Sequence, residues 1–185
     1  MMENTIRNAE ERMNKTLESF RYDLSMIRAG RANPKLLDKI SISYYGVQTP
    51  IQQVANISVP EARMIVIAPW DRSMIKDINK AILASDIGIT PSDDGQTVRL
   101  VFPELTGERR QELVKQIKKD AEGAKVAVRN IRRDAMDAVK KLQKNSTITE
   151  DDQKDGEERI QKMTDKFIKL IDEDVEKKTV EVTTV

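Results

Sequence analysis

The chain has 185 residues, of which 38% are hydrophobic, 34% charged and 4% aromatic, and its net charge is +1. The absence of cysteine excludes disulfides and Cys-type zinc sites, and the absence of histidine removes the side chain best suited to proton transfer near neutral pH. No apolar run approaches the ~20 residues of a membrane span, and the polar, mixed-charge start lacks a secretory signal. We therefore expect a cytoplasmic protein that does not contact membranes.

The first segment is predicted to form an amphipathic helix that runs to about Ala29. Its apolar residues recur at alternating steps of three and four, which places them on one helix face. They are Ile6, Ala9, Met13, Leu17, Phe20, Leu24 and Ile27. Gly30 is typical of a helix end, and Pro34 opposes any continuation.

Residues 31–103 change to the shorter period of β-strands. Strands are expected at 40–45, within 51–59, at 64–68 and at 97–102, with turns at 46–50 and 91–95. Ser73 is expected to cap a helix between the last two strands. The inner face of that helix is predicted to carry Ile75, Ile78, Ile82 and Leu83. This stretch therefore predicts a small inserted β/α/β domain.

Two further helices are predicted after the insert. Heptad-like apolar spacing runs from about Thr106 to Lys144, a helix of roughly 55 Å at ~1.5 Å per residue. Another stripe follows the acidic start at Glu150. The last seven residues contain six β-branched side chains, so we expect this final helix to end early.

The predicted fold class is α+β. Three amphipathic helices cannot bury their stripes alone, so we expect them to pack as a three-helix bundle from residues 1–30 and 104–185. The inserted domain would comprise residues 31–103. Two short linkers join the domains, and small interdomain surfaces usually permit relative motion. We expect the hinge at Gly30 and Arg31 and at Pro103, Glu104, Leu105 and Thr106.

Charge is unevenly distributed along the chain. The segment from Glu108 to Lys144 holds twelve Lys and Arg against six Asp and Glu, whereas residues 145–185 hold seven against twelve. With Ala124 at the centre of the buried seam and 100° per residue, one band of cations lies at about 80–140°. It comprises Lys118, Lys125, Arg129 and Arg132, and Arg133, Lys115 and Lys140 extend it.

Arg129, Arg132 and Arg133 fall within two helical turns and form a compact guanidinium cluster. Planar guanidinium groups can bind phosphate through two hydrogen bonds and stack on bases, so the cluster favours a nucleic-acid contact. A solvated helix face with charge pairs one turn apart explains the same pattern and stays open. Arg28 and Arg31 add two cations at the expected hinge, where favourable charges at a helix C-terminus are the alternative explanation.

Other candidate sites are weaker. Tyr44 and Tyr45 could stack on bases, but a strand that ends in a turn explains them more simply. The run from Glu150 to Asp152 lacks the spacing of a calcium loop and is interpreted as a helix start. No glycine-rich phosphate loop is present. An enzyme would need paired acids in a pocket, and Asp71, Asp77 and Asp86 form no convincing constellation.

Several motifs together resemble those of the bacterial ribosome recycling factor family. They are Arg28-Ala-Gly-Arg-Ala-Asn-Pro34, Tyr44-Tyr-Gly46 with Thr49-Pro50, Trp70-Asp-Arg-Ser73, Lys80-Ala-Ile-Leu-Ala-Ser-Asp86, Leu105 with Glu108-Arg-Arg110, and Val128-Arg-Asn-Ile-Arg-Arg-Asp134. Each motif is weak by itself. Their common order over essentially the whole chain makes the resemblance specific.

The resemblance implies an L-shaped, tRNA-like molecule that acts with elongation factor G. By GTP hydrolysis in that partner, the two proteins split post-termination ribosomes into subunits and release mRNA and tRNA. The protein itself would be a monomer without catalytic activity or cofactor. Positions that match the family's RNA contacts would hold large-subunit ribosomal RNA near the peptidyl-transferase region: Arg28, Arg31, Arg129, Arg132 and Arg133.

The alternative from a different class is a helical coiled-coil adaptor with no RNA role. An adaptor accounts for the apolar seams but leaves the arginine cluster and the insert unexplained. The two hypotheses differ in salt dependence, because RNA binding weakens steeply with salt and apolar helix docking does not.

Overall fold

A computed structural model describes residues 1–27 and 30–184, and it divides into two compact units. One unit comprises residues 1–24 and 110–184, and the other comprises residues 25–109. The expected division lay six residues later at the first crossing, after residue 30 instead of 24, and six residues earlier at the second, after residue 103 instead of 109. The linker residues on either side of the insert therefore group with the small unit.

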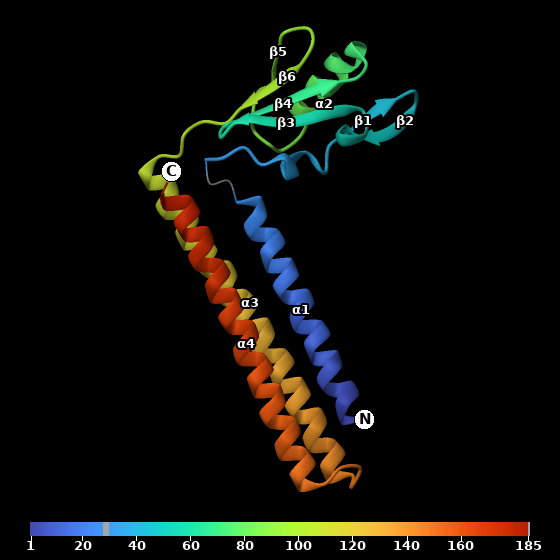
Figure 1. Cartoon of the computed structure of the whole chain (residues 1–185), viewed down its shortest axis with the longest axis vertical. Coiled ribbons are helices and arrows are strands. Elements are labelled where there is room, and N and C mark those ends of the chain that lie inside the picture. The colour runs from blue at the N-terminus through green and yellow to red at the C-terminus, as the bar shows by residue number, and fades with distance from the viewer. Residues whose placement is uncertain (28–29, 185) are drawn as a thin grey trace. The chain divides into compact units, whose positions relative to one another are not determined.

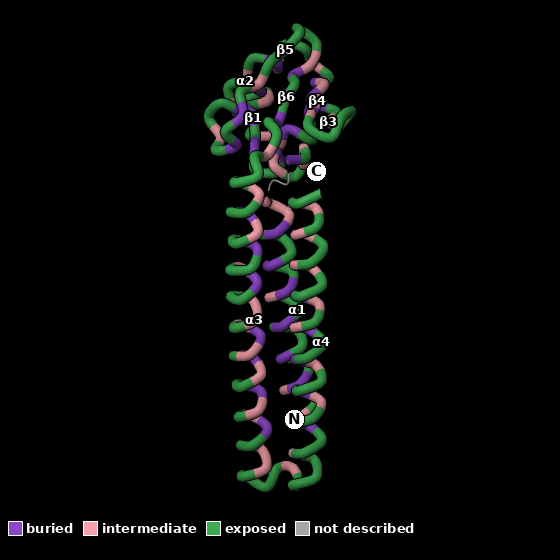
Figure 2. The backbone as a smooth tube through the Cα atoms, turned by 90° about the vertical axis from the view of Figure 1, so that its left-hand side faces the viewer, coloured by how far each residue is buried: buried purple, intermediate pink, exposed green. Residues whose placement is uncertain are grey.

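The helical unit consists of α1 (Met2–Met26), α3 (Gly107–Lys144) and α4 (Glu150–Thr183). Figure 1 shows the three helices running side by side along their length. Buried residues recur as one stripe on each helix (Figure 2). On α3 the stripe contains Leu113, Ile117, Ala121, Val128, Ile131, Ala135 and Val139, as the apolar spacing predicts.

Polar contacts join the three helices around this apolar seam. Arg12 of α1 pairs with Asp134 of α3 at 2.9 Å, and Arg21 of α1 pairs with Asp174 of α4 at 2.6 Å. Gly156 of α4 permits a close approach, because an added Cβ would lie 2.8 Å from Met2 Sδ. The sequence pattern identified the seam but missed this contact, since one glycine in a polar stretch carries no periodic signal.

The two ends of α4 are defined by different interactions. Thr149 accepts a hydrogen bond from the Asp152 amide, and Asp152 accepts one from the Thr149 amide, which forms a capping box. These hydrogen bonds hold the pKa of the Asp152 carboxyl below its ordinary value. The expectation of an early end was wrong, because α4 continues to Thr183 with Val182 fully buried. Burial of Val182 outweighs the weak helix propensity of the β-branched residues around it.

The small unit is built on two antiparallel sheets. A hairpin of β1 (Ser41–Tyr44) and β2 (Val47–Pro50) forms the first. The second has the order β3-β4-β6-β5 and consists of β3 (Ala55–Glu61), β4 (Met64–Pro69), β5 (Ser92–Asp93) and β6 (Val98–Val101). Strand β5 was missed, because its two residues, Ser92 and Asp93, lie in a stretch that has the composition of a turn.

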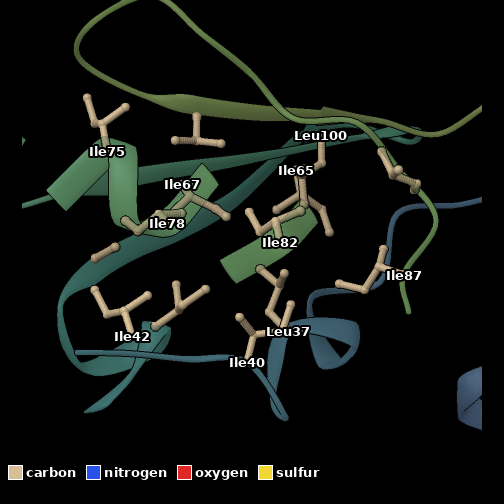
Figure 3. Packing of buried hydrophobic residues seen from close by; sticks show 14 of the residues in the cluster. Leu37, Ile40, Ile42, Ile65, Ile67, Ile75, Ile78, Ile82, Ile87 and Leu100 are labelled. Carbon is tan, nitrogen blue, oxygen red and sulfur yellow. The ribbon is translucent and has the colours of Figure 1, made fainter. Parts of the chain in front are cut away.

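Helix α2 (Ile75–Ala84) supplies the centre of the small unit's core. Ile75, Ile78 and Ile82 of this helix are buried, and Figure 3 shows Ile78 and Ile82 beside Ile65 and Ile67 of β4. Leu83 was wrongly placed on the inner face, since it is 61% exposed. Three short 3-10 helices complete the unit: η1 (Pro34–Leu37), η2 (Ile51–Gln53) and η3 (Arg72–Met74).

The cap before α2 also differs from the prediction. Asp71, rather than Ser73, occupies the capping position of η3, and its carboxylate accepts hydrogen bonds from the Ser73 amide and hydroxyl at 3.0 and 2.7 Å. Among the helices of the described residues, none is long and apolar enough to cross a membrane.

Candidate nucleic-acid interface

Arg132 of the predicted band is oriented by a side chain of α4. Its Nη1 donates a hydrogen bond to Oε1 of Gln161 on α4 at 3.2 Å, and the Gln161 amide donates to Oδ1 of Asp165 at 2.9 Å. This chain of contacts holds the guanidinium beside α4 while leaving it partly exposed. A guanidinium carries five N–H donors, so most remain available to an external phosphate.

Arg129 and Arg133 lie on the same stretch of α3, where Arg129 is half-buried and Arg133 exposed. Neither side chain forms an ion pair with any residue that the structure describes. Arg129 and Arg133 are four residues apart, so the three arginines fall within about 6 Å along the helix axis, at ~1.5 Å per residue. Such a cluster of largely uncompensated guanidinium groups suits a polyanion.

Lys125 differs from the other members of the band. Its Nζ lies 2.5 Å from Oδ1 of Asp172 on α4, and its side chain is only 16% exposed. The helical wheel placed Lys125 on an open face because it contains no information about α4. This lysine contributes to packing between α3 and α4, whereas Lys118, about two turns earlier on α3, is exposed.

The remaining predicted cations lie in the first linker. Arg31 is exposed in the small unit. Arg28 lies outside the described residues.

Both linkers are attached to the β3–β4 turn of the small unit. The Ala32 amide donates to the Ala62 carbonyl at 2.7 Å, and the Phe102 amide donates to the Arg63 carbonyl at 2.8 Å. Arg63 also pairs with Glu104 at 3.4 Å. Residues 62 and 63 thus connect the incoming and outgoing linkers. Sequence reasoning missed this connection because these residues belong to a turn without any distinctive motif.

The two linkers also contact each other. Gly30 is buried with a φ of +74°, and a Cβ added there would lie 3.4 Å from Cγ of Leu105. Any residue other than glycine would have a strained backbone at that φ. Thr106 follows and accepts a hydrogen bond from the Arg109 amide at 3.1 Å, which satisfies one free amide at the start of α3. Pro103 and Glu104 are exposed.

The acidic residues considered for catalysis do not form a metal-type cluster. No group of three or more Asp and Glu side chains suited to an ion occurs within residues 1–27 and 30–184. Asp71 serves as a helix cap, and the hydrogen bonds from Ser73 hold the pKa of its carboxyl below the ordinary value.

Comparison with known proteins decides the family. The family model described as "Ribosome recycling factor" matches residues 20–182. The chain belongs to the ribosome recycling factor family. A ribosome-recycling factor of Caldicellulosiruptor bescii is 60% identical over 171 residues, covering 92% of this chain and 93% of that protein. One of Lachnoclostridium phytofermentans is 58% identical over 184 residues, covering 100% of both.

Solved ribosome recycling factors share the fold. A solution structure superposes with a TM-score of 0.82 at 38% identity, covering 100% of this chain and 98% of the other. A second match, at 41% identity and a TM-score of 0.65, covers 98% of both chains. It comes from models of the Thermus thermophilus ribosome recycling factor and Escherichia coli elongation factor G bound to the E. coli post-termination complex.

In this member of the family, the arginine cluster lies on α3, and residues of α4 orient Arg132. Gln161 and Asp165 are the functional candidates that sequence reasoning missed. They lie about 30 residues away along the chain, and only antiparallel packing of α3 and α4 brings them to Arg132. The coiled-coil adaptor hypothesis is not favoured by these comparisons.

Proposed function

We propose that the protein acts with elongation factor G and GTP to split post-termination ribosomes into subunits, which releases mRNA and tRNA. The observation that carries this proposal is the similarity of the chain, over nearly its full length and both units, to ribosome recycling factors. One such relative has been placed together with elongation factor G on a post-termination complex. The protein is a translation factor, and GTP hydrolysis belongs to its partner.

We assign the ribosomal RNA contact to the exposed cations of α3. Arg129, Arg132 and Arg133 offer guanidinium groups without acidic partners in the described residues, and the Gln161 contact keeps Arg132 oriented. Lys118, Arg31 and Arg28 are the further proposed contacts, on large-subunit RNA near the peptidyl-transferase region. Lys125 is the weakest member of this set because Asp172 already neutralises it.

We further propose that the small unit moves relative to the helical unit when elongation factor G acts on it. Hydrogen bonds of Ala32 and Phe102 to the β3–β4 turn support motion of the linkers together with the small unit. The pivot would then lie at the outer ends of the predicted hinge, next to Gly30 and Arg31 in one linker and at Thr106 in the other. Pro103, Glu104 and Leu105 would remain with the small unit.

Subunit splitting on purified post-termination ribosomes tests the proposed function. Light scattering should fall as ribosomes split when the protein, elongation factor G and GTP are all present. The scattering should stay at its starting level if any one of them is omitted or if GTP is replaced by a non-hydrolysable analogue. Binding to ribosomes without splitting under the complete conditions would contradict the proposal.

The hinge is tested separately by locking the two units together. The chain contains no cysteine, so a single engineered disulfide between them would have no competing thiols. We expect the oxidised protein to bind ribosomes without splitting them, and reduction to restore splitting. Full activity of several differently locked proteins would show that motion is unnecessary.

We expect a cytoplasmic monomer that requires no cofactor of its own.

A further inference from the structure

We propose that the small unit carries a second RNA-binding surface, made of Trp70 and the exposed cations of η3 and α2, which holds an unpaired strand. This goes beyond the proposed function, which assigns RNA contacts to α3 and to Arg28 and Arg31 in the first linker. The surface is defined by Trp70, Arg72, Lys76 and Lys80, and is called the Trp70 surface below.

The first observation is the exposure of Trp70, the only tryptophan of the chain. Its side chain is 72% exposed, although tryptophan is usually largely buried. It lies directly after β4, and its backbone amide donates to the Val54 carbonyl at 3.1 Å, so the residue is held at a defined place on the sheet. An exposed indole on an anchored backbone offers a flat face to a base or to another apolar group.

The second observation is the row of cations that follows it. Arg72, Lys76 and Lys80 occur at successive steps of four residues, and all three are exposed. Lys76 and Lys80 both belong to α2, where a step of four places their side chains on one helix face at a rise of about 6 Å, and Arg72 precedes them on η3. The buried face of α2, formed by Ile75, Ile78 and Ile82, points the other way into the core.

The third observation is that these charges are uncompensated. Two other cations of the small unit are paired, Arg63 with Glu104 and Arg99 with Asp94. In the described part of the chain, no ion pair reaches any cation of the Trp70 surface. Two acids lie next to these residues in the sequence. Asp71 is engaged by the Ser73 amide and hydroxyl, and Asp77 forms no ion pair with any residue that the structure describes.

These features together favour a single strand of RNA over other partners. Regularly spaced cations match successive phosphates, and the indole supplies a stacking platform for a base, which is the usual combination in proteins that bind single strands. A purely apolar protein partner would leave the row of cations unused, and an acidic one would leave the indole without a flat partner.

Trp70 is a built-in reporter for the experiment, because the helical unit has no tryptophan. The full-length protein is titrated with a short oligouridylate while tryptophan fluorescence is followed at several salt concentrations. We expect quenching with an affinity that falls steeply with salt. The double variant Lys76→Gln/Lys80→Gln should weaken binding and reduce the slope of log affinity against log salt by about 1.4, at ~0.7 per phosphate contact on a single strand.

A matched control removes the same charge elsewhere in the small unit. Lys35 and Lys39 are exposed, four residues apart and not next to a tryptophan, so Lys35→Gln/Lys39→Gln should leave quenching and slope nearly unchanged. Arg129→Gln/Arg133→Gln, in the helical unit, should also leave the quenching intact. With fluorescently labelled oligouridylate, Trp70→Leu should weaken binding roughly tenfold and Trp70→Phe much less.

The proposal is overturned if oligouridylate does not quench Trp70, or if both lysine pairs have equal effects, which would indicate general charge attraction. Loss of quenching in the Arg129/Arg133 variant would place the RNA on α3 and also overturn it. If elongation factor G alone changes Trp70 fluorescence in a manner that depends on Lys76 and Lys80, while oligouridylate does not, the surface binds protein. None of these outcomes depends on ribosome splitting.

Discussion

In the helical unit the buried side chains form three narrow stripes that run the length of α1, α3 and α4, whereas in the small unit they gather around α2 and one sheet (Figures 2 and 3). Each helix stripe is stable only because the other two cover it. The small unit closes its core with short elements from a single stretch of chain. A long bundle therefore leaves extended faces free for a polyanion, while the compact unit offers shorter ones, such as the outer face of α2.

The largest effect is expected at the centre of the bundle seam. Val128→Asp would bury an unpaired carboxylate at a fully buried position, which costs several kcal/mol. Because the helical unit holds most of the helix, circular dichroism should show loss of helical signal at a greatly lowered melting temperature. Val126→Asp is the control, since Val126 is 48% exposed and should tolerate a charge. Equal melting of both variants would mean that the seam is misassigned.

A core truncation in the small unit tests whether the cores of the two units are independent. Ile82 is 1% exposed, so Ile82→Ala should cost about 2–5 kcal/mol from lost burial and the cavity left behind. Hydrogen exchange should show protection lost in the small unit and retained in the three long helices. Leu83→Ala, one residue away at an exposed position, should change stability little. Loss of protection in both units would contradict independent cores.

The functional contrast between the units is tested at Arg132. Arg132→Ala should leave the melting curve unchanged and weaken ribosome binding by on the order of 1–3 kcal/mol, because a charge-assisted phosphate contact is lost. Lys125→Ala should weaken binding less, since that lysine is paired with Asp172. Both affinities can be measured by filter binding at moderate salt. If Arg132→Ala binds with unchanged affinity, the assignment of the RNA contact to this cluster is wrong.

The smallest effect is expected at two helical glycines of the bundle. Gly123 has open space around the position of a Cβ, so Gly123→Ala should stabilise the helical unit by about 0.5–1 kcal/mol. At Gly156 the added Cβ would meet Met2 Sδ at 2.8 Å, so Gly156→Ala should gain less or lose stability. Urea denaturation followed by circular dichroism would resolve the difference. Equal gains would show that Met2 moves aside freely.

By itself, the sequence determined the features that depend on neighbours along one helix or strand. The stripe of α3, the alternation of β1 and the arginine cluster follow from local periodicity. The end of α1 was predicted at about Ala29, whereas the helix ends at Met26. The ordered motifs were also sufficient to identify the family, because they extend over the whole chain.

Tertiary structure alone decided which of these residues meet. Asp172 neutralises Lys125, Gln161 orients Arg132, and burial of Val182 extends α4 past the predicted end. It also attached both linkers to residues 62 and 63. The physical reason is that a helical wheel describes one helix in isolation. The charge and exposure of a side chain depend on the elements packed beside it, and these come from distant parts of the chain.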